Sequence, residues 1–323
     1  MLRSTQTFLL ASLIILLAAC ETVVDVDIPD ETSRLVPNAF LEDGQPMVLR
    51  LTQSQSILTN RPLQAVSGAA VTVQEEDGEE INLIEEPETP GVYYAARRAV
   101  AGERYTLSIT KDGFESAEAT AFIRDPIAIE ALDYDTTVTR YRYDYGDSIV
   151  VGEDIDISEM RITFDDPAAE RNFYELAVII RQSYVETVYD EEGNPFTDTV
   201  VYYIQQYLES DDPAFAGSQG DFVEGEDAVY GELLTFSDEF LNGDRYTLRF
   251  KPQIYFYGEG DSRTVLVVLR TISEERYLYF QSADLQYYND GNPFAEPVQV
   301  YSNVSNGFGI FAGFSADSVK VEF

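Results

Sequence analysis

The chain has 323 residues, with 21 Lys and Arg against 58 Asp and Glu, which gives a formal net charge of −37 at pH 7. This acidity argues against nucleic acid as a ligand and against electrostatic docking onto anionic lipid headgroups. The chain has no histidine and one cysteine. These counts exclude disulfides, Ser-His-Asp and Cys-His nucleophilic catalysis, and the usual zinc and copper sites.

The amino end has the three parts of an export signal. Arg3 and the amino group make a short positive region, and residues 8–19 are almost wholly apolar. That stretch is too short to cross a bilayer, which needs about 20 helical residues. It ends in Leu17-Ala18-Ala19-Cys20, which resembles the lipobox of bacterial lipoproteins. We therefore expect residues 1–19 to be a signal peptide, Cys20 to carry lipid, and residues 20–33 to form an acidic tether.

Short strands are expected between residues 34 and 125. In residues 105–110, polar Thr106, Ser108 and Thr110 alternate with apolar side chains, which is typical of a half-buried strand. Six or seven short strands separated by turn signals favour an Ig-like or prealbumin-like β-sandwich. The expected strands are residues 35–41, 47–53, 69–74, 92–96, 105–110 and 117–123.

Asp125-Pro126 marks the predicted boundary with a second, β-rich domain of residues 126–323. Residues 172–188 and 199–209 are expected to form one long hairpin around the turn at 190–195. Further strands are predicted at 245–252 and 265–272. One helix is expected to begin after Ser273, whose side chain can cap it, and to end at 290–293.

Carboxylates offer the remaining routes to chemistry. Calcium is the plausible metal, and Asp154 and Asp156 form one of the tightest acidic clusters, although they do not fit an EF-hand loop. The alternative is that these acids lie on solvated turns. A carboxylate-based glycoside hydrolase is also possible in principle, because it needs only two acids at a suitable separation.

Aromatic clusters are the candidate contact residues for a ligand or partner: Tyr255, Phe256, Tyr257, Tyr287 and Tyr288. Tyrosine provides a large amphipathic area at low entropic cost, which suits protein or sugar contacts. The alternative is that these are ordinary residues of a sheet face. Gly307 and Gly309 lack the spacing of a nucleotide loop, and we expect them to let strands bend and pack closely.

Several stretches resemble an uncharacterised family of Bacteroidota outer-membrane lipoproteins that is known as a conserved domain of unknown function. They are residues 24–29, 68–73, 91–93, 105–107, 166–167, 172–174, 272–275, 292–297, 303 and 307–311. The resemblance implies a lipid-anchored protein of the outer membrane, at the cell surface or on its periplasmic face. It also implies an accessory role beside a TonB-dependent transporter, and it transfers no catalytic residue.

The sequence therefore predicts a mainly β protein, with an amino-terminal sandwich and a β-rich domain carrying one short helix. The expected function is non-catalytic binding as an accessory to a TonB-dependent uptake system. Two alternatives are a structural or adhesin-like surface protein and a carboxylate-based glycoside hydrolase.

Overall fold

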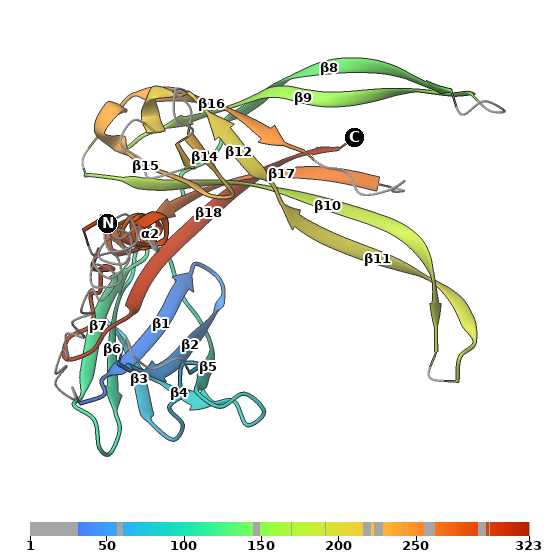
Figure 1. Ribbon diagram of the computed structural model, residues 1–323. Helices are drawn as coiled ribbons and strands as arrows, with labels where there is room; N and C mark the ends of the chain where they lie inside the picture. The colour runs from blue at the N-terminus through green and yellow to red at the C-terminus, as the bar shows by residue number, and fades with distance from the viewer. Residues whose placement is uncertain are drawn as a thin grey trace, which may run out of the picture. The chain divides into compact units, whose positions relative to one another are not determined.

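The computed structural model describes residues 32–56, 61–144, 149–168, 170–190, 192–215, 221–222, 229–241, 243–254, 262–289, 295–296 and 298–322. The protein is mainly β in these ranges, with a single α-helix (Figure 1). No helix within them has both the length and the apolar character that a membrane crossing requires. The predicted signal peptide, Cys20 and most of the tether lie outside the described residues.

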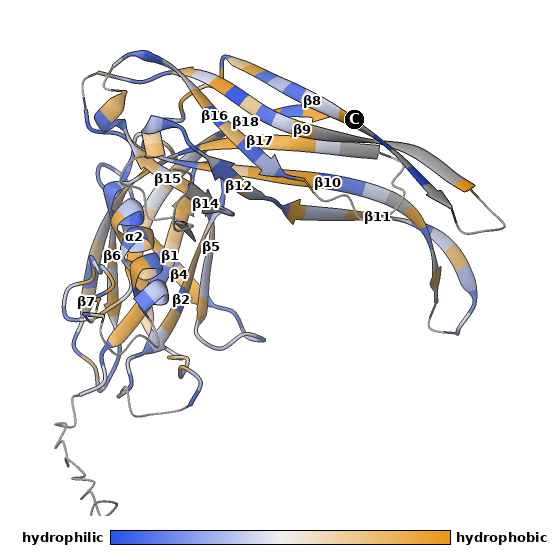
Figure 2. Ribbon diagram, turned by 45° about the horizontal axis from the view of Figure 1, so that its top comes forward, coloured by the Kyte–Doolittle hydropathy of each residue, from blue (hydrophilic) through white to orange (hydrophobic). Residues whose placement is uncertain are grey.

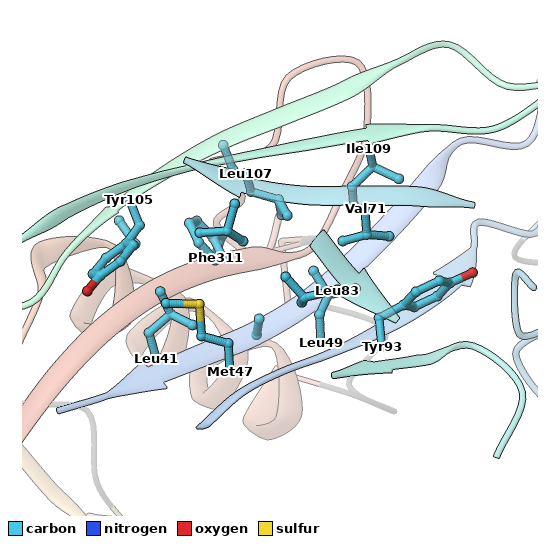
Figure 3. Packing of buried hydrophobic residues seen from close by; sticks show 14 of the residues in the cluster. Leu41, Met47, Leu49, Val71, Leu83, Tyr93, Tyr105, Leu107, Ile109 and Phe311 are labelled. Carbon is cyan, nitrogen blue, oxygen red and sulfur yellow. The ribbon is translucent and has the colours of Figure 1, made fainter. Parts of the chain in front are cut away.

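Seven strands from the first part of the chain surround one hydrophobic cluster. They are β1 (Leu35–Glu42), β2 (Pro46–Gln53), β3 (Ala70–Glu75), β4 (Glu80–Glu85), β5 (Val92–Arg98), β6 (Arg104–Thr110) and β7 (Ala117–Phe122). Alternate residues of β1 and β6 are buried, so the period-two pattern directs one face of each strand into the cluster. Figure 3 shows Leu41, Met47, Leu49, Tyr105 and Phe311 among its members. The predicted sandwich is confirmed, and β4 is an additional strand.

The last strand, β18 (Ile310–Glu322), joins the two parts of the fold. It pairs in parallel with β1, where Asn38 is opposite Ile310, and antiparallel with β17 (Ser262–Ile272). Val304 and Phe311 are buried in the first cluster. The predicted division into residues 34–125 and 126–323 stays a prediction, since β18 serves strands on both sides of it.

Glycines permit the close approach of the carboxyl-terminal segment to β1. Gly309 has φ +99°, and a Cβ there would lie 2.1 Å from the carbonyl oxygen of Pro37. A Cβ on Gly307 would lie 2.5 Å from the carbonyl oxygen of Leu35. The expectation that these glycines allow close packing is therefore confirmed.

The second part of the chain contributes longer strands. They are β8 (Ala131–Asp144), β9 (Ile149–Asp165), β10 (Phe173–Tyr189), β11 (Pro195–Gln205), β12 (Tyr207–Ser210), β13 (Asp221–Phe222), β14 (Val229–Gly231), β15 (Leu234–Ser237), β16 (Arg245–Gln253) and β17, with 3-10 turns at Pro213–Phe215 and Asp238–Phe240. One sheet has the order β11-β10-β17-β18-β1-β2-β5-β4-β3-β6-β7, with β15 on β10, and the other has the order β13-β14-β12-β16-β9-β8.

A second hydrophobic cluster fills the space between these two sheets. Leu176, Val178 and Ile180 of β10 enter it, together with residues of β9, β16 and β17. Figure 2 shows the hydrophobic character of β17, whose Val265, Val267 and Leu269 belong to the same cluster. The predicted hairpin is confirmed, except that its second strand begins at Pro195 and ends at Gln205. Neither β8 nor β9 was predicted.

The helix α2 (Glu274–Asn289) packs on the sheet that contains β1 and β10, on the face to which Phe40 and Phe173 belong. The Ser273 hydroxyl accepts the N–H of Arg276 at 3.3 Å, which confirms the predicted cap. Phe280 stacks on Phe40 of β1 with 5.6 Å between ring centroids, and Tyr277 contacts Phe173 of β10 at 4.7 Å. Aromatic contacts therefore hold the helix against β1 and β10.

Candidate binding surface

The predicted aromatic contact residues divide into two groups. Tyr255, Phe256 and Tyr257 lie outside the described residues. Tyr287 and Tyr288 lie in the last turn of α2, with 78% and 47% of their surface exposed. Their rings meet edge to face with 5.8 Å between centroids. Their accessibility fits a contact role, which stays a prediction.

The predicted calcium residues lie on a strand. Asp154 and Asp156 belong to β9, opposite Thr139 and Thr137 of β8 in an antiparallel ladder. Their backbone is therefore in a strand and not in the expected turn, their side chains are outside the description, and calcium binding stays a prediction. Among the described residues, no group of three or more His, Cys, Asp or Glu side chains could hold a metal ion.

Two buried aspartates form a hydrogen-bonded network beside the second cluster. Asp166 accepts hydrogen bonds from the Tyr174 hydroxyl and from the backbone N–H of Gly243 at 2.7 Å. Asp238 accepts the backbone N–H of Asn172 at 2.7 Å, and burial raises its pKa above the usual range. Asp166 and Asp238 are each only 5% exposed, and their backbone donors, Asn172 and Gly243, belong to the turns before β10 and β16. The arrangement fixes these turns and gives no open face to a substrate.

A buried ion pair joins α2 to the sheet. Glu175 of β10 is fully buried, and Arg276 approaches it with Nη2–Oε1 and Nη2–Oε2 distances of 3.0 and 2.9 Å. Arg270 of β17 also pairs with Glu175. The guanidinium of Arg276 lies 4.7 Å from the ring centroid of Phe40 and 4.5 Å from that of Phe314. Such an enclosed arginine positions the helix and has no surface for a ligand.

The far half of the hairpin formed by β10 and β11 extends beyond the second cluster. Among the described residues, β17 pairs with β10 as far as Ser183, opposite Ser262, whereas β11 pairs with β10 as far as Tyr189. Beyond Ser183 the described hairpin is therefore a ribbon of two strands (Figure 1). A two-stranded ribbon is only marginally stable by itself, because neither face has a core to cover it.

The ribbon ends in a well-defined turn. The Asp190 carboxylate accepts the backbone N–H groups of Glu192 and Asn194 at 3.0 and 2.8 Å. Hydrogen bonds from Asn194, chiefly its backbone N–H, lower the pKa of Asp190, so the carboxylate is charged at neutral pH. Gly193 supplies a φ of +85° that other residues rarely adopt. These bonds fix the register of the ribbon at its tip.

Large apolar side chains are exposed on both faces of the hairpin, three of them on the two-stranded ribbon and three where β17 still pairs with β10. We call the following residues, each at least 37% exposed, the hairpin surface: Val185, Tyr189, Phe196, Val201, Tyr202 and Tyr203. Val185, Tyr189, Val201 and Tyr203 share one face, while Phe196 and Tyr202 share the other. The sequence predicted the hairpin but not this surface. The corresponding feature in the sequence is the run Val200 to Tyr203, in which polar and apolar side chains do not alternate.

Comparison with known proteins places the chain in a family without assigning a function. No curated protein matches the chain. A crystal structure of a DUF4785 family protein from Legionella pneumophila matches with 10% identity and a TM-score of 0.20, over 75% of this chain. The chain spans only 54% of that protein's length. The family described as a domain of unknown function (DUF4249) matches residues 21–320, and the chain belongs to that family.

Proposed function

We propose that this protein is a non-catalytic binding accessory, held at the outer membrane by lipid on Cys20, and that a protein partner docks on the hairpin surface. The observation that carries the proposal is the exposure of large apolar side chains on both faces of the β10–β11 hairpin, whose far half is a two-stranded ribbon. Groups of exposed large apolar side chains commonly mark protein contact sites. The ribbon would gain the missing core from its partner.

The residue types on the ribbon also favour a protein partner. Three of the six residues of the hairpin surface are tyrosines, which are enriched among the residues that dominate binding energies. A tyrosine on a strand has few rotatable bonds, so its immobilisation costs little entropy. The proposed partner is a TonB-dependent β-barrel transporter, as the family resemblance implies.

A pull-down with matched variants tests this proposal. The tagged, acylated full chain would be recovered from its native outer membrane in mild detergent, and the bound proteins identified by mass spectrometry. We expect a β-barrel transporter in near-equal amount with the unaltered chain. Tyr203→Ala should weaken capture by about 30-fold, which corresponds to a contact of about 2 kcal/mol.

Tyr94→Ala is the matched control, because Tyr94 is also an exposed strand tyrosine but lies on β5, away from the hairpin in sequence. It should capture the transporter as well as the unaltered chain. Cys20→Ala should release the protein from the membrane while keeping the fold. Recovery of the lipoprotein alone under all gentle conditions would refute the transporter, and equal losses with both tyrosine variants would refute the hairpin surface.

A structural or adhesin-like role is the second candidate. The exposed ribbon would also serve contacts between identical surface proteins, and polymers of the purified chain would favour this candidate over an uptake accessory.

A further inference from the structure

In the described part of the chain, the outer edge of β11 has no partner strand along its length. β11 is the last strand of its sheet, and no other strand of the described chain pairs with the side that faces away from β10. An open strand edge presents unpaired N–H and C=O groups to solvent and can add a further strand. The eleven residues of β11 are almost all exposed.

The register of the hairpin identifies which residues of β11 direct their backbone groups outward. The N–H of Gln206 donates to the carbonyl of Val178 at 2.8 Å, and the N–H of Asp190 donates to the carbonyl of Asn194 at 3.1 Å. Both pairs belong to one continuous register, in which hydrogen-bonded pairs recur at every second residue. The even-numbered residues of β11 therefore bond to β10.

The odd-numbered residues, which include Thr197, Thr199, Val201 and Tyr203, direct their N–H and C=O groups to the open edge. One further contact agrees with this assignment. The N–H of Thr199 donates to the side chain of its neighbour Asp198 at 2.8 Å, which an N–H engaged with β10 would not do. The backbone groups of Val201 and Tyr203 lie farther along the same edge, between exposed apolar side chains.

The charge around this edge defines the chemistry of an added strand. Residues 184–200 contain five Asp and Glu and no Lys or Arg, whereas Arg181 lies opposite Tyr203 at the other end of the hairpin. Within β11 itself only Asp198 is charged. A segment with alternating apolar side chains and a Lys or Arg near its ends would complement both the apolar centre of the edge and its acidic surroundings.

We infer that β11 binds an extended, basic-flanked segment of the protein partner as an additional strand of the sheet. This inference rests on the proposed function and specifies how the partner docks. Main-chain hydrogen bonds to the odd-numbered residues would hold the segment, while the side chains of the hairpin surface would select its apolar residues. A positive residue of the segment would lie near Asp198 and replace its bond to Thr199.

Val201→Pro separates backbone pairing from side-chain contact. Proline removes an outward N–H and blocks the edge, but it leaves the ladder with β10 intact because residue 201 does not bond to it. Val201→Ala is the control for the lost side chain, and Val200→Pro is the control for a broken hairpin. Circular dichroism and the melting temperature would show that Val201→Pro and Val201→Ala remain folded. If Val201→Pro does not fold, Thr199→Pro replaces it, because residue 199 also directs its backbone groups to the open edge.

The probes are the transporter captured above and a short synthetic peptide of alternating valine and threonine with a lysine at each end, compared with the same peptide ending in glutamates. We expect Val201→Pro to weaken both interactions at least tenfold and Val201→Ala to weaken them less than threefold. The glutamate peptide should bind at least tenfold more weakly than the lysine peptide.

Capture of the transporter by Val201→Pro at the level of the unaltered chain, with Tyr203→Ala still defective, would overturn strand addition and leave the proposed function standing. A dimer of the purified chain that Val201→Pro dissociates would also overturn the inference, because a second copy would then occupy the edge.

Discussion

Replacing Arg276 with alanine tests how strongly the buried ion pair holds α2 on the sheet. The change removes the partner that binds both oxygens of Glu175, a side chain with no exposed surface. Arg270 would remain paired with Glu175, so the carboxylate would keep one of its two cations. The substitution Arg276→Ala would also remove the cation that lies over the rings of Phe40 and Phe314.

The expected loss follows from these contacts. Removing one partner of a buried ion pair costs about 3–5 kcal/mol, because it leaves a buried charge that is poorly compensated. The contact with Arg270 reduces this loss, whereas the lost interaction with the aromatic rings adds about 1 kcal/mol. We therefore expect Arg276→Ala to lower the free energy of unfolding by about 3 kcal/mol.

Urea denaturation followed by circular dichroism gives the measurement. Lys320→Ala is the control, since Lys320 Nζ lies 3.0 Å from a Glu322 oxygen, but both side chains are mostly exposed. Such surface pairs contribute about 0–1 kcal/mol, so this variant should differ little from the unaltered chain. A loss below about 1 kcal/mol for Arg276→Ala would show that the pair does not hold the helix.

Two further predictions concern the backbone and pH. Gly309→Ala should destabilise the protein by more than about 3 kcal/mol in the same urea assay, because a Cβ would meet backbone 2.1 Å away; Gly113→Ala, with φ +87° and open space, should cost only about 1 kcal/mol, and equal losses would contradict the close approach. Asp238 has a pKa that burial raises in the folded state, so its contribution to stability decreases as pH rises from about 4 through that raised value. Asp238→Asn lacks this titration, and its stability relative to the unaltered chain should therefore improve between pH 4 and pH 7; a constant difference would refute the prediction.

Local patterns in the sequence predicted most strands of the first part and the single helix. β1, β2 and β6 alternate buried and exposed residues, which is the signal that a one-sided strand leaves in a sequence. β4 was missed because Leu83 is its only buried residue and acids occupy both its ends. The helix was found from Ser273 and the spacing of its aromatic residues.

The longer strands could not be read in the same way. Where the side chains of β8 are described, nearly all are exposed, so the strand depends on its register with β9 rather than on apolar alternation. The parallel pairing of β18 with β1 depends on residues far apart in the chain, for which no local signal exists. The run Val200 to Tyr203 suggests a buried strand in the sequence, whereas the structure exposes it. Burial is a property of the surrounding fold, so the run by itself could not show that the hairpin surface is exposed.

The position of β18 also sets the order in which the protein can fold. Val304 and Phe311 complete the first cluster, although all the strands from β8 to β17 lie between them and β7 in the chain. Contacts between residues so far apart in sequence form late, because the intervening chain must be ordered first. Strands β1 to β7 are therefore expected to keep one part of their core uncovered until the second part of the chain has folded. The pairing of β18 with β1 would be the step that completes both the first cluster and the sheet.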